Sequence, residues 1–77
     1  MMNDTYLYPY SSAEARERDE LPLWRESHKA NIACRNAIED AIRQSFDGMH
    51  LDKNCLTPVL TEYGYKRTAW VLANTLH

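Results

Sequence analysis

The side chains best suited to chemistry in this 77-residue chain are two cysteines and three histidines. Thiolates and imidazoles serve as nucleophiles, bases and zinc ligands, and zinc sites place them at short spacings such as C-x2-C. None of the five stands at such a spacing; they are His28, Cys34, His50, Cys55 and His77. We therefore expect neither a metal site nor a bound cofactor.

A nucleophilic thiol needs a neighbouring base, and the chain offers few such pairs. Cys34 falls on the apolar face of a predicted helix, where burial raises the pKa of a thiol and makes it inert. Cys55 and His50 are the thiol–imidazole pair that lies close in sequence. Glu39 and Asp40 are adjacent, so on a helix they project about 100° apart and do not form a catalytic dyad. We therefore interpret the chain as a non-enzyme.

Composition and charge narrow the class of protein further. The chain is 44% hydrophobic with only 2 glycines, which favours one folded helical domain over residues 1–77 and leaves no Gly-rich phosphate loop. The net charge is -2 and no segment forms a basic stripe, so a DNA contact would depend on a few residues or on oligomerisation. No stretch approaches the ~20 apolar residues of a membrane span, and no signal peptide is recognisable. We expect a cytoplasmic protein.

The N-terminal part is predicted to be an extended arm followed by a short helix. Residues 1–10 carry Tyr6, Tyr8 and Tyr10 around a proline, which favours an extended conformation. We expect the three rings either to cover one side of a small helical core or to contact a partner. Ser11 and Glu14 have the S-x-x-E spacing of a capping box, which predicts a charged, solvated helix over 12–19.

A long amphipathic helix is predicted over 22–46, with Pro22 in its first turn. One side of its helical wheel is apolar or small, and the other side is charged. The first side, which we expect to face the core, holds Leu23, Trp24, Ser27, Ala30, Asn31, Cys34, Ala37, Ile38, Ala41, Ile42 and Ser45, with Phe46 at its edge. Gly48 is expected just past this helix as its C-terminal glycine.

Gly64 divides the rest of the chain into two further apolar patterns. Before it, a helix is predicted over 54–63, with Thr57 and Pro58 as an alternative start one turn later. After it, a helix is predicted over 65–76, so Gly64 takes the position of a C-cap and tight corner. The expected fold is all-α, a small bundle of about four helices with a C-terminal helix-turn-helix pair and an extended aromatic N-terminal arm.

The last predicted helix carries large side chains on two faces. Its expected core face consists of Tyr65, Ala69, Leu72, Ala73 and Leu76. One interpretation of the opposite face is that the arm or the first helix covers it. The other interpretation is a partner site, because Trp and Arg are frequent interface hot spots. The candidate partner-binding residues are those of the opposite face and of the arm: Arg67, Trp70, Val71, Asn74, Tyr6, Tyr8 and Tyr10.

The chain contains four notable stretches: Leu7-Tyr8-Pro9-Tyr10-Ser11, Leu23-Trp24-Arg25-Glu26-Ser27, Phe46-Asp47-Gly48-Met49-His50-Leu51 and Trp70-Val71-Leu72-Ala73-Asn74-Thr75. Taken together, they resemble a family of short uncharacterised domains carried by conjugative elements and phages of gut Firmicutes, and the resemblance extends from about Tyr6 to Leu76. The resemblance implies no activity and no site residues. It implies a setting, an accessory protein of a mobile genetic element in a bacterial cytoplasm. Small acidic proteins of such elements often bind host proteins, and some block defence nucleases.

Three functions are open on the sequence alone. The first is a non-enzymatic protein-binding module, including an inhibitor of a host defence or DNA-processing protein. The second is a helix-turn-helix DNA binder in which Lys66 and Arg67 open the reading helix. Nucleic acid is the less favoured partner, because Trp70, Val71 and Leu72 suit a DNA groove poorly. The third is a homodimer that buries the Trp70 and Val71 face.

Overall fold

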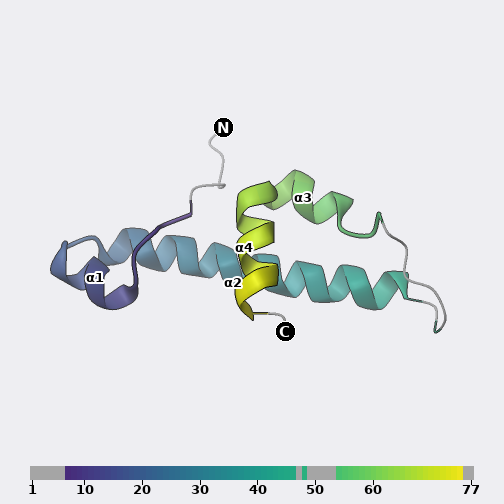
Figure 1. Ribbon diagram of the computed structural model, residues 1–77, viewed down its shortest axis with the longest axis horizontal. Coiled ribbons are helices and arrows are strands. Elements are labelled where there is room, and N and C mark those ends of the chain that lie inside the picture. Colours follow the sequence, from purple (N-terminus) through teal and green to yellow (C-terminus); the bar gives the residue numbers. More distant parts are fainter. Residues whose placement is uncertain (1–6, 47, 49–53, 76–77) are drawn as a thin grey trace.

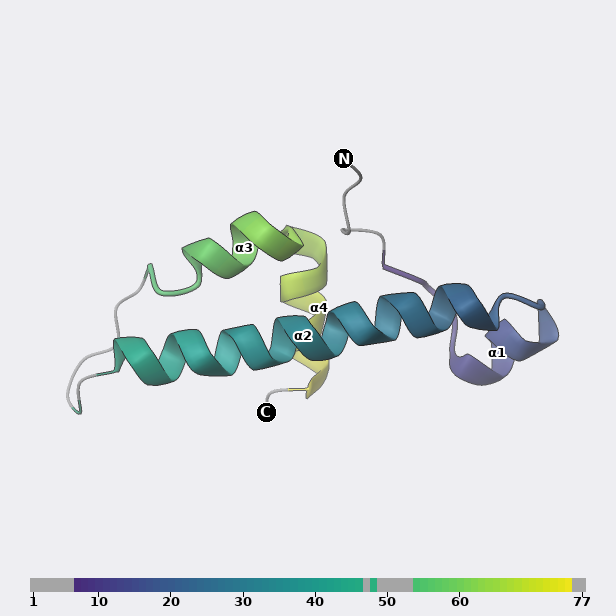
Figure 2. The same ribbon diagram turned by 180° about the vertical axis from the view of Figure 1, so that it is seen from behind.

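The computed structural model describes residues 7–46, 48 and 54–75, and the regular structure in these ranges is helical. The helices are α1 (Ser12–Glu17), α2 (Leu21–Ser45), α3 (Thr57–Tyr63) and α4 (Tyr65–Thr75), which confirms the predicted all-α fold. In Figures 1 and 2, α2 is a long central helix, α1 folds back at its N-terminal end, α3 lies along its second half and α4 crosses near its middle. The molecule measures 48 × 29 × 14 Å. It is therefore thin, and the shorter helices form a single layer on the long helix α2.

The start of α1 is the predicted capping box. The Glu14 amide donates to Ser11 Oγ at 3.2 Å, and the Ser11 amide donates to Glu14 Oε1 at 3.4 Å. The helix ends before the predicted last residue, Asp19, because Asp19 has a φ of 59° in the left-handed region. The Glu20 amide then donates to the Ala15 carbonyl at 2.7 Å, which turns the chain back toward α2.

Each end of α2 lies one residue before the predicted bound. The helix begins at Leu21 with Pro22 in its first turn. It ends at Ser45, because the backbone of Phe46 is extended, with φ -88° and ψ 122°. The prediction that Gly48 caps the helix is therefore wrong, although Gly48 does have a positive φ of 96°.

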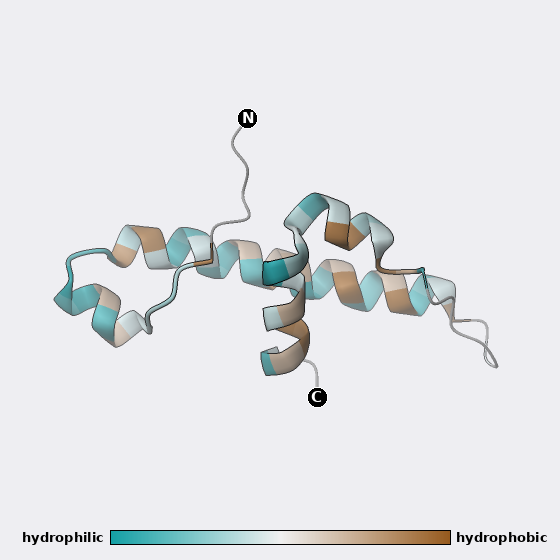
Figure 3. Cartoon of the chain, turned by 45° about the horizontal axis from the view of Figure 1, so that its top comes forward, coloured by the Kyte–Doolittle hydropathy of each residue, from teal (hydrophilic) through white to brown (hydrophobic). Residues whose placement is uncertain are grey.

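The apolar core is small and lies where α2, α3 and α4 meet. Its buried members are Cys34 and Ile38 from α2, Val59 from α3 and Val71 from α4. Partly buried side chains surround them: Ala37, Ala41, Ile42, Leu56 and Tyr63. In Figure 3 the hydrophobic stretches of α3 and of the second half of α2 lie close to each other. The small residues predicted for the inward side of α2 let the other two helices approach closely.

The corner between α3 and α4 is confirmed at Gly64. Its φ of 86° and ψ of 157° define a backbone region that is essentially restricted to glycine. Its amide donates to the Leu60 carbonyl at 2.9 Å, and α4 begins at the next residue. The start of α3 corrects the predicted helix over 54–63. Residues 54–56 form a turn, and α3 begins at the alternative start, Thr57, with Pro58 in its first turn.

The side of α4 that faces the core differs from the prediction. Arg67, Thr68 and Val71 are buried, with 1%, 0% and 0% of their surface exposed. Tyr65 and Leu72, which were expected in the core, are 76% and 36% exposed. The other members of the expected core face are half-buried (Ala69), exposed (Ala73) or outside the described residues (Leu76). The predicted core face of α4 is therefore wrong.

Polar contacts with α2 explain this rotation of α4. One guanidinium nitrogen of Arg67 donates to the Ser27 carbonyl at 3.0 Å. Two turns further along α2 toward the core, the Thr68 hydroxyl lies 3.8 Å from Cys34 Sγ. These contacts hold the polar side of α4 against α2, and the apolar stripe of α4 consequently faces away.

Candidate protein-binding groove

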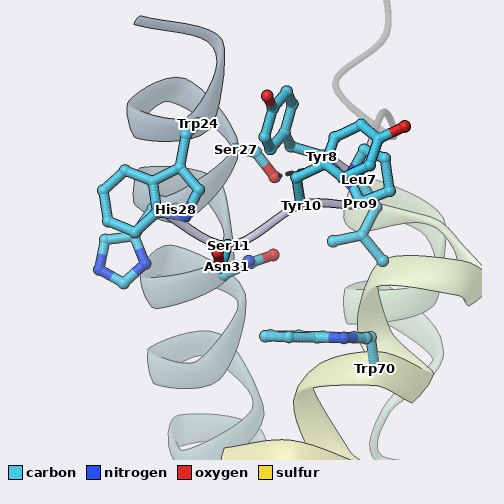
Figure 4. A pocket seen from close by; sticks show the side chains of 10 residues that line it. All are labelled: Leu7, Tyr8, Pro9, Tyr10, Ser11, Trp24, Ser27, His28, Asn31 and Trp70. Carbon is cyan, nitrogen blue, oxygen red and sulfur yellow. Dashed lines mark hydrogen bonds between the residues drawn. The ribbon is translucent and has the colours of Figure 1, made fainter. Parts of the chain in front are cut away.

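A groove of about 400 Å³ lies between the N-terminal arm, α2 and α4 and is partly open to solvent. In Figure 4 the arm residues lie above the indole of Trp70, and α2 forms the wall beside them. We call this site the aromatic groove. Its lining residues are Leu7, Tyr8, Pro9, Tyr10, Ser11, Trp24, Ser27, His28, Asn31 and Trp70.

Tyr8 anchors the arm to the first half of α2. Its backbone amide donates to Ser27 Oγ at 3.1 Å, and its hydroxyl donates to Glu20 Oε1 at 2.6 Å. The hydrogen bond from Tyr8 lowers the pKa of Glu20 below its ordinary value, and a further bond from Arg18 acts in the same direction. Because Tyr8 is only 8% exposed, it serves as a fixed wall of the groove.

Tyr10 forms the more accessible part of the arm. Its ring meets the ring of Tyr8 edge to face, with 5.6 Å between centroids and an interplanar angle of 70°. The Arg18 guanidinium carbon lies 4.1 Å from the Tyr10 centroid, a cation–π contact. One face of Tyr10 is thus held by the protein, while 37% of the residue remains exposed.

A stacked pair on α2 forms another wall of the groove. The rings of Trp24 and His28 lie 4.6 Å apart at an interplanar angle of 11°. They are one helical turn apart, and i, i+4 neighbours meet on the surface of a helix. Trp24 is half-buried and His28 is exposed, so the pair presents flat aromatic surface at the groove edge.

Arg67 fixes the wall of the groove that Ser27 and Asn31 form. Its guanidinium donates to the Ser27 carbonyl at 3.0 Å, to Ser27 Oγ at 3.4 Å and to Asn31 Oδ1. Ser27 Oγ also accepts from the arm, so one hydroxyl joins the arm, α2 and α4. At 1% exposure, Arg67 positions the wall and does not itself meet a partner.

Three of the predicted partner-binding residues come together in the aromatic groove. Tyr8 and Tyr10 approach from the arm and Trp70 approaches from α4. Trp70 is 41% exposed, so its indole is available for contact. The interpretation of the arm as cover for the helical core is confirmed for Tyr8, which is buried.

Three further predicted residues, Arg67, Val71 and Asn74, do not line the groove. Arg67 and Val71 are buried against α2, so the prediction that they lie on an accessible face is wrong. Asn74 is exposed, and its side-chain amide donates to the Trp70 carbonyl at 2.8 Å within α4. Tyr6 lies outside the described residues.

Trp24, His28 and Asn31 belong to the groove but were not predicted as site residues. Trp24 and Asn31 were placed on the core side of α2 by the helical wheel. The i, i+4 spacing of Trp24 and His28 was the available signal for a stacked pair. Their role follows from the arm and α4, which reach the same part of α2.

The two cysteines do not line the aromatic groove, whereas His28 does. Cys34 is fully buried, and burial raises the pKa of its thiol. Cys55 is half-buried in a second hollow of about 370 Å³ between α2 and α3, and its candidate partner His50 lies outside the described residues. Over the described ranges, no three His, Cys, Asp or Glu side chains gather in a way that could hold a metal ion. Nor does any helix in that part of the chain have the length and apolarity to cross a membrane.

The family of the chain follows from a match over almost its whole length. Searches of curated proteins and of solved structures gave no match. A family described as "Protein of unknown function (DUF3849)" matches residues 7–77, a range that includes the arm, α1 to α4 and the aromatic groove. The chain belongs to this DUF3849 family of proteins of unknown function.

Proposed function

We propose that this chain is a non-enzymatic protein-binding module whose aromatic groove holds an extended segment of a partner protein. The observation that carries the proposal is the convergence of Tyr8, Tyr10, Trp24 and Trp70 on one open groove of about 400 Å³. Tyrosine and tryptophan are enriched among the residues that dominate binding energy at protein interfaces. The groove walls are also held in place by the fold, which lowers the entropic cost of binding.

The chemistry of the lining favours an extended, uncharged or acidic peptide segment. The ring faces of Tyr10 and Trp70 suit proline or other apolar side chains. Indole N–H groups and the Asn31 amide supply donors for peptide carbonyls, since Asn31 Oδ1 already accepts from Arg67. The buried guanidinium behind this wall disfavours a cationic ligand.

The DNA-binding alternative has less support. Base reading by a helix-turn-helix would use cations in the first turn of its second helix. In α4 these are Lys66 and Arg67, and Arg67 is 1% exposed with its guanidinium bonded to α2. Lys66 alone would provide a weak contact to phosphates.

Intrinsic fluorescence offers a direct test of binding in the groove. The chain has two tryptophans, Trp24 and Trp70, and both line it. Peptides selected from a random library on the wild type should shift the emission as they bind. Trp70→Ala should weaken these peptides about 30-fold, the effect of a hot-spot residue.

Ile32→Ala is the matched control, because Ile32 is 47% exposed on α2 and does not line the groove. It should leave peptide affinity unchanged. If Trp70→Ala and Tyr10→Ala bind the selected peptides as tightly as the wild type, the groove is not the binding site.

The class of partner follows from the resemblance to proteins of mobile genetic elements, and we propose a host defence or DNA-processing protein of a bacterium. Such a partner should be captured from a bacterial lysate by the wild type and lost with Trp70→Ala. Recovery of the same proteins with both baits would remove this assignment.

A further inference from the structure

The outward side of α4 is an apolar stripe that the other described residues leave largely uncovered. Tyr65, Ala69, Leu72 and Ala73 lie within about 100° of each other around the helix axis. Tyr65 is 76% and Leu72 is 36% exposed, Ala73 is exposed and Ala69 is half-buried. We call these four residues the outer face of α4. It is separate from Trp70, which turns toward the aromatic groove.

The outer face of α4 is unusual for a solvated helix because it lacks charge. From Thr68 to Thr75, α4 carries no charged side chain. A helix that faces water in a monomer normally presents charged or polar residues on that side. The exposed apolar stripe of α4 is therefore of the kind that marks an interaction surface.

We propose that a second copy of this chain covers the outer face of α4, in an antiparallel pair of α4 helices related by a two-fold axis. A two-fold interface must be complementary to itself, and a charge-free stripe meets this condition without opposing like charges. Ala69 and Ala73 let the two helix axes approach closely. The ends of α4 also suit an antiparallel neighbour, because its first turn has no acidic residue and its last turn has no basic residue. Lys66 of one copy would lie near the carbonyl end of the other helix.

Sedimentation equilibrium of the full chain, from about 1 μM to about 1 mM, tests this proposal. Because α4 is only about 16 Å long, its contact area is at the small end, and we expect a dissociation constant in the micromolar range. Leu72→Glu should weaken the dimer at least about tenfold, since two carboxylates would meet across the axis. Ile32→Glu places the same charge at a similarly exposed position on α2 and should leave the dimer unchanged. Circular dichroism should show both variants folded.

A cross-linking measurement keeps the proposal testable if Leu72→Glu does not fold. In a Cys55→Ser background, Ala69→Cys should form a disulfide between copies, because the axis brings the two residues together. Asn36→Cys, on the exposed side of α2, should not. A wild type that stays monomeric over the whole range, a dimer unaffected by Leu72→Glu, or equal cross-linking at both positions would each overturn the proposal. Trp70→Ala should keep the dimer, so this test is independent of the aromatic groove.

Discussion

The helices α2 and α4, which cross near the middle of the molecule, use their amphipathic patterns in opposite ways. The buried residues of α2 are Ser27, Cys34 and Ile38, on the side that its apolar pattern predicts. Its exposed side is charged, with Arg25, Glu26, Lys29, Arg35, Asp40 and Arg43. On α4 the buried residues include Arg67 and Thr68, and the apolar stripe faces outward.

The difference shows that α4 buries its polar contacts with α2, together with Val71, in place of its apolar stripe. Ser27 and Asn31 place oxygen acceptors on the inward side of α2, where Arg67 donates to them. Turning α4 to bury Leu72 would leave these acceptors without that donor. An unsatisfied buried polar group costs about 1–3 kcal/mol, which is comparable to the gain from burying one leucine.

The largest effect is therefore expected at Arg67. Arg67→Ala removes the donor to Ser27 and Asn31 and the packing of a long side chain, and we expect a loss of about 3 kcal/mol of unfolding free energy. Urea denaturation measures this loss. Lys66→Ala, at the exposed neighbouring position, should change stability by less than about 0.5 kcal/mol. Equal losses in the two variants would mean that α4 is not rotated as described.

Two adjacent apolar residues of α4 give the next effect. Val71 is fully buried beside Cys34 and Ile38, and Val71→Ala should cost about 2 kcal/mol. Leu72→Ala, at an exposed position, should cost about 0.5 kcal/mol when measured in dilute solution, well below the dissociation constant expected for the proposed dimer. The amphipathic pattern alone predicts the reverse order. Finding that reverse order in thermal unfolding would restore the original assignment of the core face.

The corner at Gly64 sets the direction in which α4 leaves α3, and Gly64→Ala tests its contribution. Alanine is strained at φ 86° and ψ 157°, so we expect a loss of about 1.5 kcal/mol. For a domain of this size that loss lowers the melting temperature by roughly 10 °C. Thr61→Ala, at an exposed position of α3, should melt within a few degrees of the wild type. Equal melting temperatures for Gly64→Ala and the wild type would contradict the observed corner.

The starts of α1 and α2 could be predicted because their signals are local. Ser11 and Glu14 satisfy amides within one turn, and Pro22 fits a first turn without losing a hydrogen bond. The end of α1 lacks such a signal, since Asp19 occupies a left-handed conformation that usually belongs to glycine or asparagine. The rotation of α4 depends on tertiary contacts. The polar Ser27 on the apolar side of α2 was an available signal that a polar side chain would pack there, because buried polar groups need partners.

The aromatic groove could be predicted only in part, for a similar reason. The arm tyrosines and Trp70 were identified by residue type, because large aromatic side chains are rarely left without contacts. Their meeting depends on how α4 crosses α2, which no local pattern encodes. The sequence pattern could not identify Trp24 and His28 as groove residues, because a helical wheel cannot show which part of α2 the arm covers.

The smallest expected effect on stability concerns Glu20, the N-cap residue of α2. It tests whether the polar side of α2 also contributes to the fold. Tyr8 donates to Glu20 and lowers the pKa of that carboxyl in the folded protein. A lowered folded pKa means that the contribution to stability is present above the unfolded pKa of about 4.3 and is lost as the pH falls through the folded value. The wild type should thus exceed Tyr8→Phe in stability at neutral pH, and this advantage should shrink between about pH 5 and about pH 3. Tyr10→Phe is the control, because Tyr10 meets Arg18 through its ring face, and its difference from the wild type should not change over that range. A stability difference between Tyr8→Phe and the wild type that stays constant with pH would show that packing alone holds the arm. The polar side of α2 would then contribute less to the fold, and α2 and α4 would differ less than their charges suggest.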